Sequence, residues 1–154
     1  MKKFLSTVFL VTLVSANILS CVFAMAGRSS DGEGAAGDRA LASELVGNIL
    51  DAYRDYTFDD FSDKVSGDFA PDRLNFINNA ENSSLEQDII DITFTLNTVN
   101  AYDDKIGVSL EWRKKIRDKD TGDLELKKGS ADLLFSKDAD GWKLNRVSGD
   151  NPFL

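Results

Sequence analysis

The chain offers few side chains for catalysis, because it contains no histidine and its one cysteine is Cys21. The lack of histidine excludes His–Asp general bases, histidine zinc sites and Ser-His-Asp triads. The remaining acid–base option is a carboxylate base that faces a hydroxyl donor in an apolar pocket. Tyr53 and Tyr56 could supply the donor hydroxyl. A catalytic role therefore depends on whether an acid lies beside them.

Two segments in which apolar and polar residues alternate predict the strands that would have to carry such an acid. The even-numbered positions, which should point inward, are apolar: Ile90, Ile92, Phe94 and Leu96 in the first segment, and Ile106, Val108, Leu110, Trp112 and Ile116 in the second. Lys114 is the one ionisable residue on the inward face of the second strand. We expect it near the hairpin end, where its long side chain reaches solvent. Asp91 and Glu111 have outward parity. The sequence therefore predicts no catalytic residues, and both tyrosines fit a core stripe with hydroxyls at the rim.

Two acidic segments resemble calcium loops, "DKDTGD" at 118–123 and "DADG" at 138–141. An EF-hand loop that starts at Asp118 would need Gly at its sixth position and Glu at its twelfth. Those positions hold Asp123 and Gly129. Both segments fit hairpin turns rich in Asp and Gly better. We therefore expect no metal site and no other cofactor.

Three helices are expected before the strands. From Asp38, a favourable N-cap, apolar residues recur every three or four positions to about Tyr56. A short second helix starts at residue 57 and ends near Gly67. A third begins at Pro71 and ends in the polar segment "NNAENSS". These helices precede all the predicted strands, so they can gather on one face of the sheet.

The third predicted strand changes phase along its length. It begins with apolar residues at even positions, Leu124 and Leu126, and ends with apolar residues at odd positions, within 131–135. A change of phase by one residue requires a β-bulge, and we expect it at Gly129. Same-face pairing at the hairpin end would place Ile116 opposite Leu124, and beyond the bulge Leu110 would lie opposite Ala131. The bulge would also bend the sheet, because bulges increase the local twist.

This order of elements predicts an α+β domain, with N-terminal helices packed on a strongly curved, bulged antiparallel sheet of about four strands. Residues 38–153 resemble the NTF2-like, or SnoaL-like, α+β cone superfamily. The resemblance lies in "DFAPDRLNFINNAE", "VSLEWRKKIRDKDTGDLELKKGSADLLF" and the closing "DGWKLNRVSGDNPF". Exported bacterial members often end in a strand like W-x-L-x-x-x-x-G-D-x-P-F, which residues 142–153 match. The resemblance implies the cone fold, but the superfamily includes isomerases, dehydratases and binding modules, so it implies no single function.

The cone implied by this resemblance encloses an interior that could hold a small apolar ligand. The candidate lining residues are Tyr53, Tyr56, Phe94, Leu110 and Trp112. We expect a non-enzymatic binding or accessory domain whose partner is a small apolar ligand or another exported protein. Two alternatives stay open: a small isomerase- or lyase-like enzyme that uses a carboxylate and a tyrosine, and a purely structural or protein-interaction domain.

The charge of the chain bears on its partners. The formal net charge of −8 argues against nucleic acid and anionic membranes, which reward clusters of Lys and Arg. The outward face of the second strand carries Glu111, Arg113, Lys115 and Arg117. A stable dimer through this face would need apolar residues there. We therefore expect a monomer or a weak dimer.

The N-terminus has the layout of a secretory signal peptide: Met1-Lys2-Lys3 followed by an apolar run over 4–16. "AMA" before Gly27 fits ordinary cleavage, which would remove residues 1–26, and "VFA" before Met25 is a second such site. "ILSC" at 18–21 resembles a lipobox, which would instead leave a membrane-anchored lipoprotein lipidated on Cys21. We favour cleavage, giving a periplasmic or extracellular protein with no strong membrane binding. Residues 27–37 then form a flexible Gly/Ser/Asp-rich leader and residues 38–154 a single domain.

Overall fold

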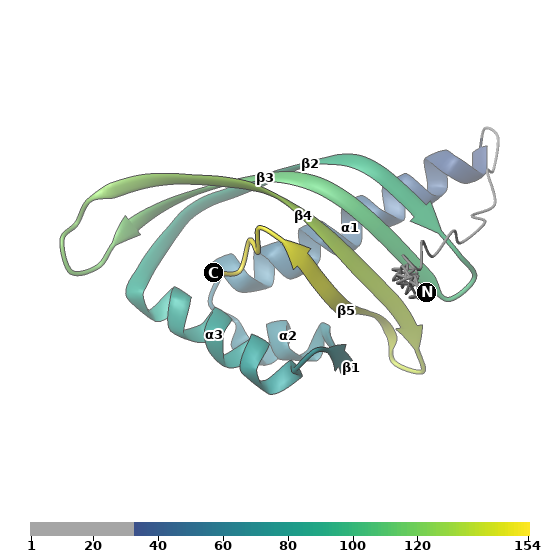
Figure 1. The fold of residues 1–154 in the computed structure, drawn as a ribbon, viewed down its shortest axis with the longest axis horizontal. Coiled ribbons are helices and arrows are strands. Elements are labelled where there is room, and N and C mark those ends of the chain that lie inside the picture. The colour runs from purple at the N-terminus through teal and green to yellow at the C-terminus, as the bar shows by residue number, and fades with distance from the viewer. Residues whose placement is uncertain (1–32) are drawn as a thin grey trace, which may run out of the picture.

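The computed structural model describes residues 33–154, so the predicted signal peptide, Cys21 and the start of the leader lie outside the described residues. The elements in order are α1 (Glu33–Arg54), α2 (Phe58–Asp63), β1 (Val65–Ala70), α3 (Arg73–Glu86), β2 (Gln87–Ala101), β3 (Lys105–Asp118), β4 (Leu124–Asp138) and β5 (Gly141–Gly149). The sheet arches over the three helices (Figure 1). In the described part of the chain, every helix is too short or too polar to cross a bilayer.

The first helix positions the deepest part of the core. It begins at Glu33, within the range expected for the leader, and ends at Arg54. Its fully buried stripe runs through Ala42, Val46, Ile49 and Tyr53, whose spacings of four, three and four keep them on one helix face. Leu41 and Leu45, which belong to the expected apolar stripe, lie half-buried at its margin.

The third helix starts later and runs further than the sequence predicts. Its N-cap is Asp72, whose side chain accepts a hydrogen bond from the backbone N–H of Asn75 at 3.0 Å. The polar segment "NNAENSS" lies inside the helix and does not end it. Within it, Ala80 and Ser84 are four residues apart and fully buried. A buried stripe of small residues lets the helix pack closely on the sheet, and this contact outweighs the weak helix propensity of Asn and Ser.

The sheet has five strands in the order β1-β5-β4-β3-β2 and is mixed, whereas four antiparallel strands were expected. The strands β2 to β5 form the expected antiparallel meander. The additional strand, β1, pairs in parallel with β5, with Val65 opposite Leu144. The second helix was predicted to run to about Gly67, and this was wrong because α2 ends at Asp63. The edge of β5 supplies hydrogen-bond partners to this segment, and such a long-range pairing leaves no local period in the sequence.

The expected bulge at Gly129 was also wrong. The pairing of β3 with β4 is continuous, from Lys105 opposite Ser136 to Arg117 opposite Leu124. Leu124 and Leu126 therefore lie on the outer face, where they are 57% and 66% exposed. The hairpin projects beyond the helices at this end (Figure 1). On β4 neither face is covered there, since Glu125, between the two leucines, is exposed as well. No burial therefore drives the leucines inward.

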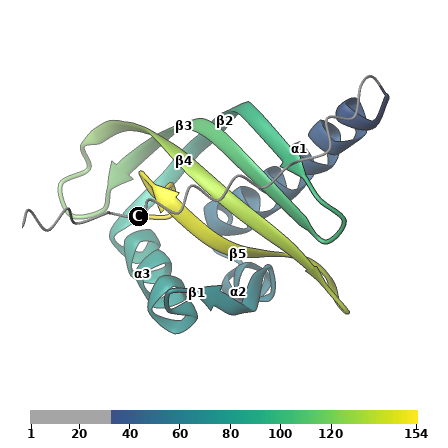
Figure 2. The ribbon, with the colours of Figure 1, turned by 45° about the vertical axis from the view of Figure 1, so that its right-hand side comes forward.

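The bulges that curve the sheet lie elsewhere. The pairing of β2 with β3 shifts between Ile89 and Asp91 and again between Leu96 and Thr98. The first shift turns Ile89 inward, 7% exposed, and leaves Ile90 outward, 42% exposed, which reverses the expected orientation of Ile90. The pairing of β4 with β5 shifts next to Phe135. Bulges increase local twist, and a second view shows the strands crossing over α1 (Figure 2).

Candidate functional site

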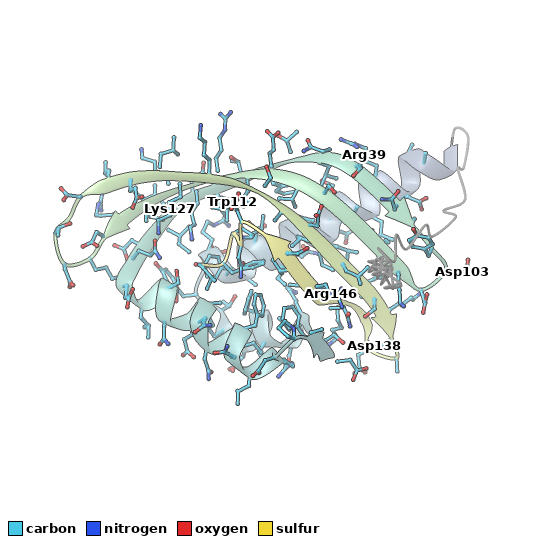
Figure 3. All side chains as sticks on the ribbon, in the orientation of Figure 1. Arg39, Asp103, Trp112, Lys127, Asp138 and Arg146 are labelled. Atoms are coloured by element: carbon cyan, nitrogen blue, oxygen red, sulfur yellow. The ribbon has the colours of Figure 1, made fainter. Side chains whose placement is uncertain are left out.

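The space between the arched sheet and the helices is filled by side chains (Figure 3). Phe153, from the segment after β5, is fully buried at its centre. The Phe153 ring packs against those of Tyr53, Phe61 and Phe76, at centroid distances of 5.4, 5.3 and 5.6 Å. The indole N–H of Trp112 donates to the main-chain oxygen of Asp150 at 2.7 Å and fixes the start of this segment. Residues 150–154 therefore close the cone from within.

Lys114 is fully buried beneath this closing segment. Its ammonium donates to the main-chain oxygen of Leu154 at 2.8 Å and lies 3.4 Å from the hydroxyl oxygen of Tyr53. The expectation that Lys114 reaches solvent was therefore wrong, because β3 continues past it and the C-terminal residues cover it. Burial lowers the pKa of Lys114 to about 8, and the neighbouring charge of Lys127, directly opposite on β4, adds to this shift.

A chain of polar side chains leads from Lys114 to the rim. The Tyr53 hydroxyl donates to the hydroxyl of Ser83 at 3.3 Å, and burial raises the pKa of Tyr53 to about 12. The amide nitrogen of Gln87 donates to the same Ser83 oxygen at 2.6 Å. Lys127 donates to the amide oxygen of Gln87 at 3.5 Å. Each buried polar group on this path therefore has a partner, so the network holds Tyr53 and Lys114 in one geometry.

Carboxylates are absent from the buried polar set of residues 33–154, which consists of Ser66, Ser84, Gln87 and Lys114. Asp91 and Glu111 are exposed, as their outward parity predicts. In the described part of the chain, the tyrosine–carboxylate pair needed for isomerase chemistry is therefore not assembled inside the cone. Sequence reasoning singled out both Tyr53 and Lys114, but it missed that they meet.

The five pocket candidates separate into two groups. Tyr53, Leu110 and Trp112 are buried together in the interior, with 0%, 1% and 5% of their surfaces exposed. Tyr56 lies at the rim, 39% exposed, where its hydroxyl donates to the main-chain oxygen of Gln87 at 2.8 Å. Phe94 is half-buried on β2 and lines two surface hollows.

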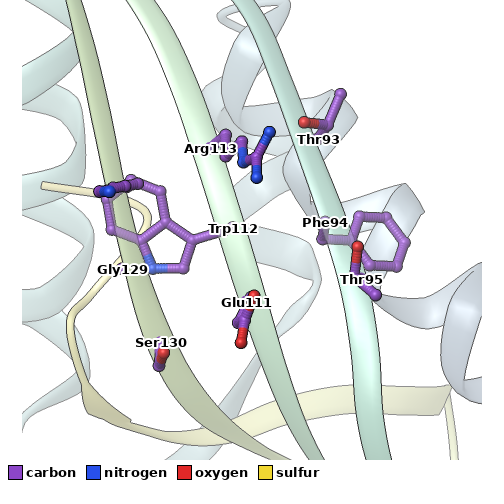
Figure 4. A pocket seen from close by; sticks show the side chains of 9 residues that line it. Thr93, Phe94, Thr95, Glu111, Trp112, Arg113, Gly129 and Ser130 are labelled. Atoms are coloured by element: carbon purple, nitrogen blue, oxygen red, sulfur yellow. The ribbon is translucent and has the colours of Figure 1, made fainter.

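One of these hollows, of about 520 Å³, lies on the outer face of the sheet (Figure 4). Six outward side chains from three neighbouring strands surround it: Thr93, Thr95, Glu111, Arg113, Lys128 and Ser130. They form two cross-strand rows, in which Arg113 is paired with Thr93 and Lys128, and Glu111 with Thr95 and Ser130. The sequence predicted a solvated polar face here, and its periodicity carries no signal for a hollow.

The two acidic segments form tight turns. The carboxylate of Asp118 accepts hydrogen bonds from the backbone N–H groups of Asp120 and Thr121, at 2.9 and 2.7 Å. These bonds, the one from Thr121 above all, lower the pKa of Asp118. Asp138 accepts similarly from the N–H of Asp140 at 2.9 Å. Across residues 33–154, no three acidic, histidine or cysteine side chains converge into a metal-binding group.

Comparison with known proteins gives structural matches only. No protein-family model matches the chain. No curated protein matches it either. A conserved protein from Planctomyces limnophilus has a similar structure, with a TM-score of 0.64 and 16% identity over 75% of this chain and 99% of that protein.

Two further solved structures agree with this match. An NTF2-like superfamily protein from Salmonella enterica matches with a TM-score of 0.60 and 12% identity, over 76% of this chain and 92% of that one. A ketosteroid isomerase-like protein from Erwinia carotovora matches with a TM-score of 0.58 and 18% identity, over 79% and 99%. At these identities the likeness concerns the fold alone. The chain has the NTF2-like fold that its sequence predicted.

Proposed function

We propose that this chain is an exported, non-enzymatic binding domain that engages another exported protein through the outer face of its sheet. The observation that carries the proposal is the occupied interior. Phe153 fills the centre of the cone, and the buried polar residues there include no acid within residues 33–154. A fold of this kind is compatible with many functions, so the choice rests on the site.

A catalytic function is less well supported. A general base must come within hydrogen-bond reach of the proton that it removes. Asp91 and Glu111 lie on the far side of the sheet from Tyr53. The remaining candidate, Lys114, is fully buried and donates a hydrogen bond to the main-chain oxygen of Leu154. A substrate would therefore have to displace part of the core before it could meet an ionisable group.

A second candidate function is binding of a small apolar ligand inside the cone, and the contact between Lys114 and Leu154 favours it. The main-chain oxygen of Leu154 lies where the carbonyl or carboxylate oxygen of a ligand could sit, 2.8 Å from the ammonium nitrogen. Tyr53, Leu110 and Trp112 would surround the apolar body of such a ligand. Entry would require residues 151–154 to leave.

Site-specific photocrosslinking tests the proposal. A photoreactive amino acid replaces Leu126 on the outer face or, as the matched control, Leu74 on α3; the two leucines are 66% and 67% exposed. In the native host we expect a discrete protein adduct from position 126 and none from position 74. Equal adducts from both positions, or none from either, would overturn the proposal.

Titration with octanoate, a carboxylate on an apolar chain, distinguishes ligand binding inside the cone from the main proposal. The measurement is tryptophan fluorescence. Under the main proposal, octanoate leaves the tryptophan fluorescence unchanged. A saturable change that is lost in Lys114→Met would instead favour ligand binding inside the cone, because Trp112 is part of that interior.

A further inference from the structure

The projecting end of the β3–β4 hairpin carries an unusual outer surface. Four cations and three apolar residues are exposed there, and we refer to them together as the cationic face. Its members are Arg113, Lys115, Arg117, Lys128, Ile90, Leu124 and Leu126. Cross-strand pairing places a cation opposite an apolar residue twice: Lys115 lies opposite Leu126, and Arg117 lies opposite Leu124. Apolar side chains thus lie beside the aliphatic stems of the cations.

These four cations are not engaged within the protein. Ion pairs among residues 33–154 involve Arg54 and Lys119 only. The acids opposite or between these cations are Asp88, opposite Arg117, Asp91, opposite Lys115, and Glu111. Asp88 forms its ion pair with Lys119, and none of the three forms an ion pair with a member of the cationic face. Four unengaged cations on one face contrast with the net charge of −8 of the whole chain.

We infer that the cationic face binds an extended, acidic segment of a partner protein, with apolar side chains between its acids; this inference rests on the function proposed above. Arg113, Lys115 and Arg117 occupy alternate positions of one strand, so they repeat every ~6.6 Å. Alternate acids of an extended segment repeat at the same interval. The hollow beside Arg113 and Lys128 would accept one side chain of the segment.

Two other occupants fit less well. A second copy that docks through the same face in a two-fold arrangement would bring the four cations against the same four cations. An anionic membrane would attract the cations, but the turn at the tip of the hairpin carries Asp118, Asp120 and Asp123 beside Leu124. Those carboxylates would be pressed against the lipid phosphates if the leucines entered the bilayer.

A defined peptide tests the inference with the full mature chain. The probe is a fluorescein-labelled peptide of alternating Glu and Val, and the control peptide carries Gln in place of Glu. Fluorescence anisotropy measures binding at low and at high salt. We expect the Glu peptide to bind, to weaken on the order of tenfold in high salt, and to bind better than the Gln peptide, because exposed charge pairs are screened.

Matched variants locate the binding. In the double variant Arg113→Gln/Lys128→Gln we expect affinity to fall on the order of tenfold. The control Arg146→Gln/Lys137→Gln removes the same charge from exposed positions on β5 and β4 and should leave affinity nearly unchanged. All four positions are exposed, so each variant should keep the wild-type circular dichroism spectrum.

Several results would overturn the inference. One is an equal loss of peptide affinity in the two double variants. Another is equal affinity for the Glu and Gln peptides. Binding to phosphatidylglycerol vesicles but not to the peptide would assign the face to a membrane. Self-association lost in Arg113→Gln/Lys128→Gln would assign it to a second copy. If the adduct at position 126 persists while the acidic peptide fails, the binding function stands and only the acidic partner is rejected.

Discussion

Replacement of the buried lysine by Met should change how stability depends on pH. The pKa of Lys114 is about 8 in the folded chain and 10.5 for a free lysine. Below pH 8, Lys114 is protonated in both the folded and the unfolded chain. The folded chain then bears the full free-energy cost of burying the charged ammonium. Between pH 8 and 10.5 the unfolded chain binds more protons, so the stability of the wild type rises with pH.

The size of the effect follows from the two pKa values. Between pH 7 and pH 10, the linkage contribution of Lys114 to the unfolding free energy increases by roughly 2 to 3 kcal/mol. Lys114→Met lacks this contribution. We therefore expect its stability relative to the wild type to fall by about that amount over the same range. The packing change caused by Met adds an offset that does not depend on pH.

Urea unfolding followed by circular dichroism, at pH steps from 7 to 10, measures the difference. The matched control is Lys115→Met, since Lys115 is the next residue of β3 but is exposed. Its stability should run parallel to that of the wild type at every pH. Parallel curves for Lys114→Met as well would refute the reasoning, because they would mean that the Lys114 ammonium is as well solvated in the fold as in the unfolded chain.

Three further predictions concern other parts of the chain. Gly129→Val should destabilise the domain by about 1 kcal/mol or more, because a Cβ at Gly129 would lie 2.5 Å from Cβ of Asp150. Gly107→Val, on the neighbouring strand, should cost less, since its nearest contact would be 3.9 Å away; equal midpoints in urea would contradict this. The exported protein should begin near residue 25 or 27 without lipid, and an intact mass that starts at Cys21 with a diacylglyceryl group would prove otherwise. Calorimetry should detect no tight calcium binding, and a micromolar affinity lost in Asp118→Ala would show that the turn is a metal site.

Local periodicity predicted the fold class because most buried residues can be identified from the alternation or spacing within one strand or helix. The even-numbered residues of β3 are all buried, from Ile106 to Ile116, as alternation requires. The same rule failed at Ile90 and Leu126. A bulge reverses one of them, and the other lies where the hairpin leaves the helices. Periodicity reports burial only where something covers the strand.

The candidate site was harder to predict because its parts are distant in sequence. The residues that meet Lys114 come from α1 and from the last residue of the chain shown here, Tyr53 and Leu154. No spacing rule joins such positions. The outer hollow is equally hidden, since its shape arises from the curvature of three strands and its residues look like an ordinary solvated face.

The position of β5 has a consequence for the order of folding. This last strand lies between β1 and β4, and the residues that follow it fill the centre of the core. A chain emerging N-terminus first from a ribosome or a translocation channel can form α1 and the β2–β3 hairpin early, but it cannot close the cone until Phe153 has emerged. Contacts between residues as far apart as Tyr53 and Phe153 carry a high loop-closure cost, which slows folding. Until then the aromatic interior stays open to solvent, so the emerging chain is exposed to proteases and chaperones until Phe153 is available.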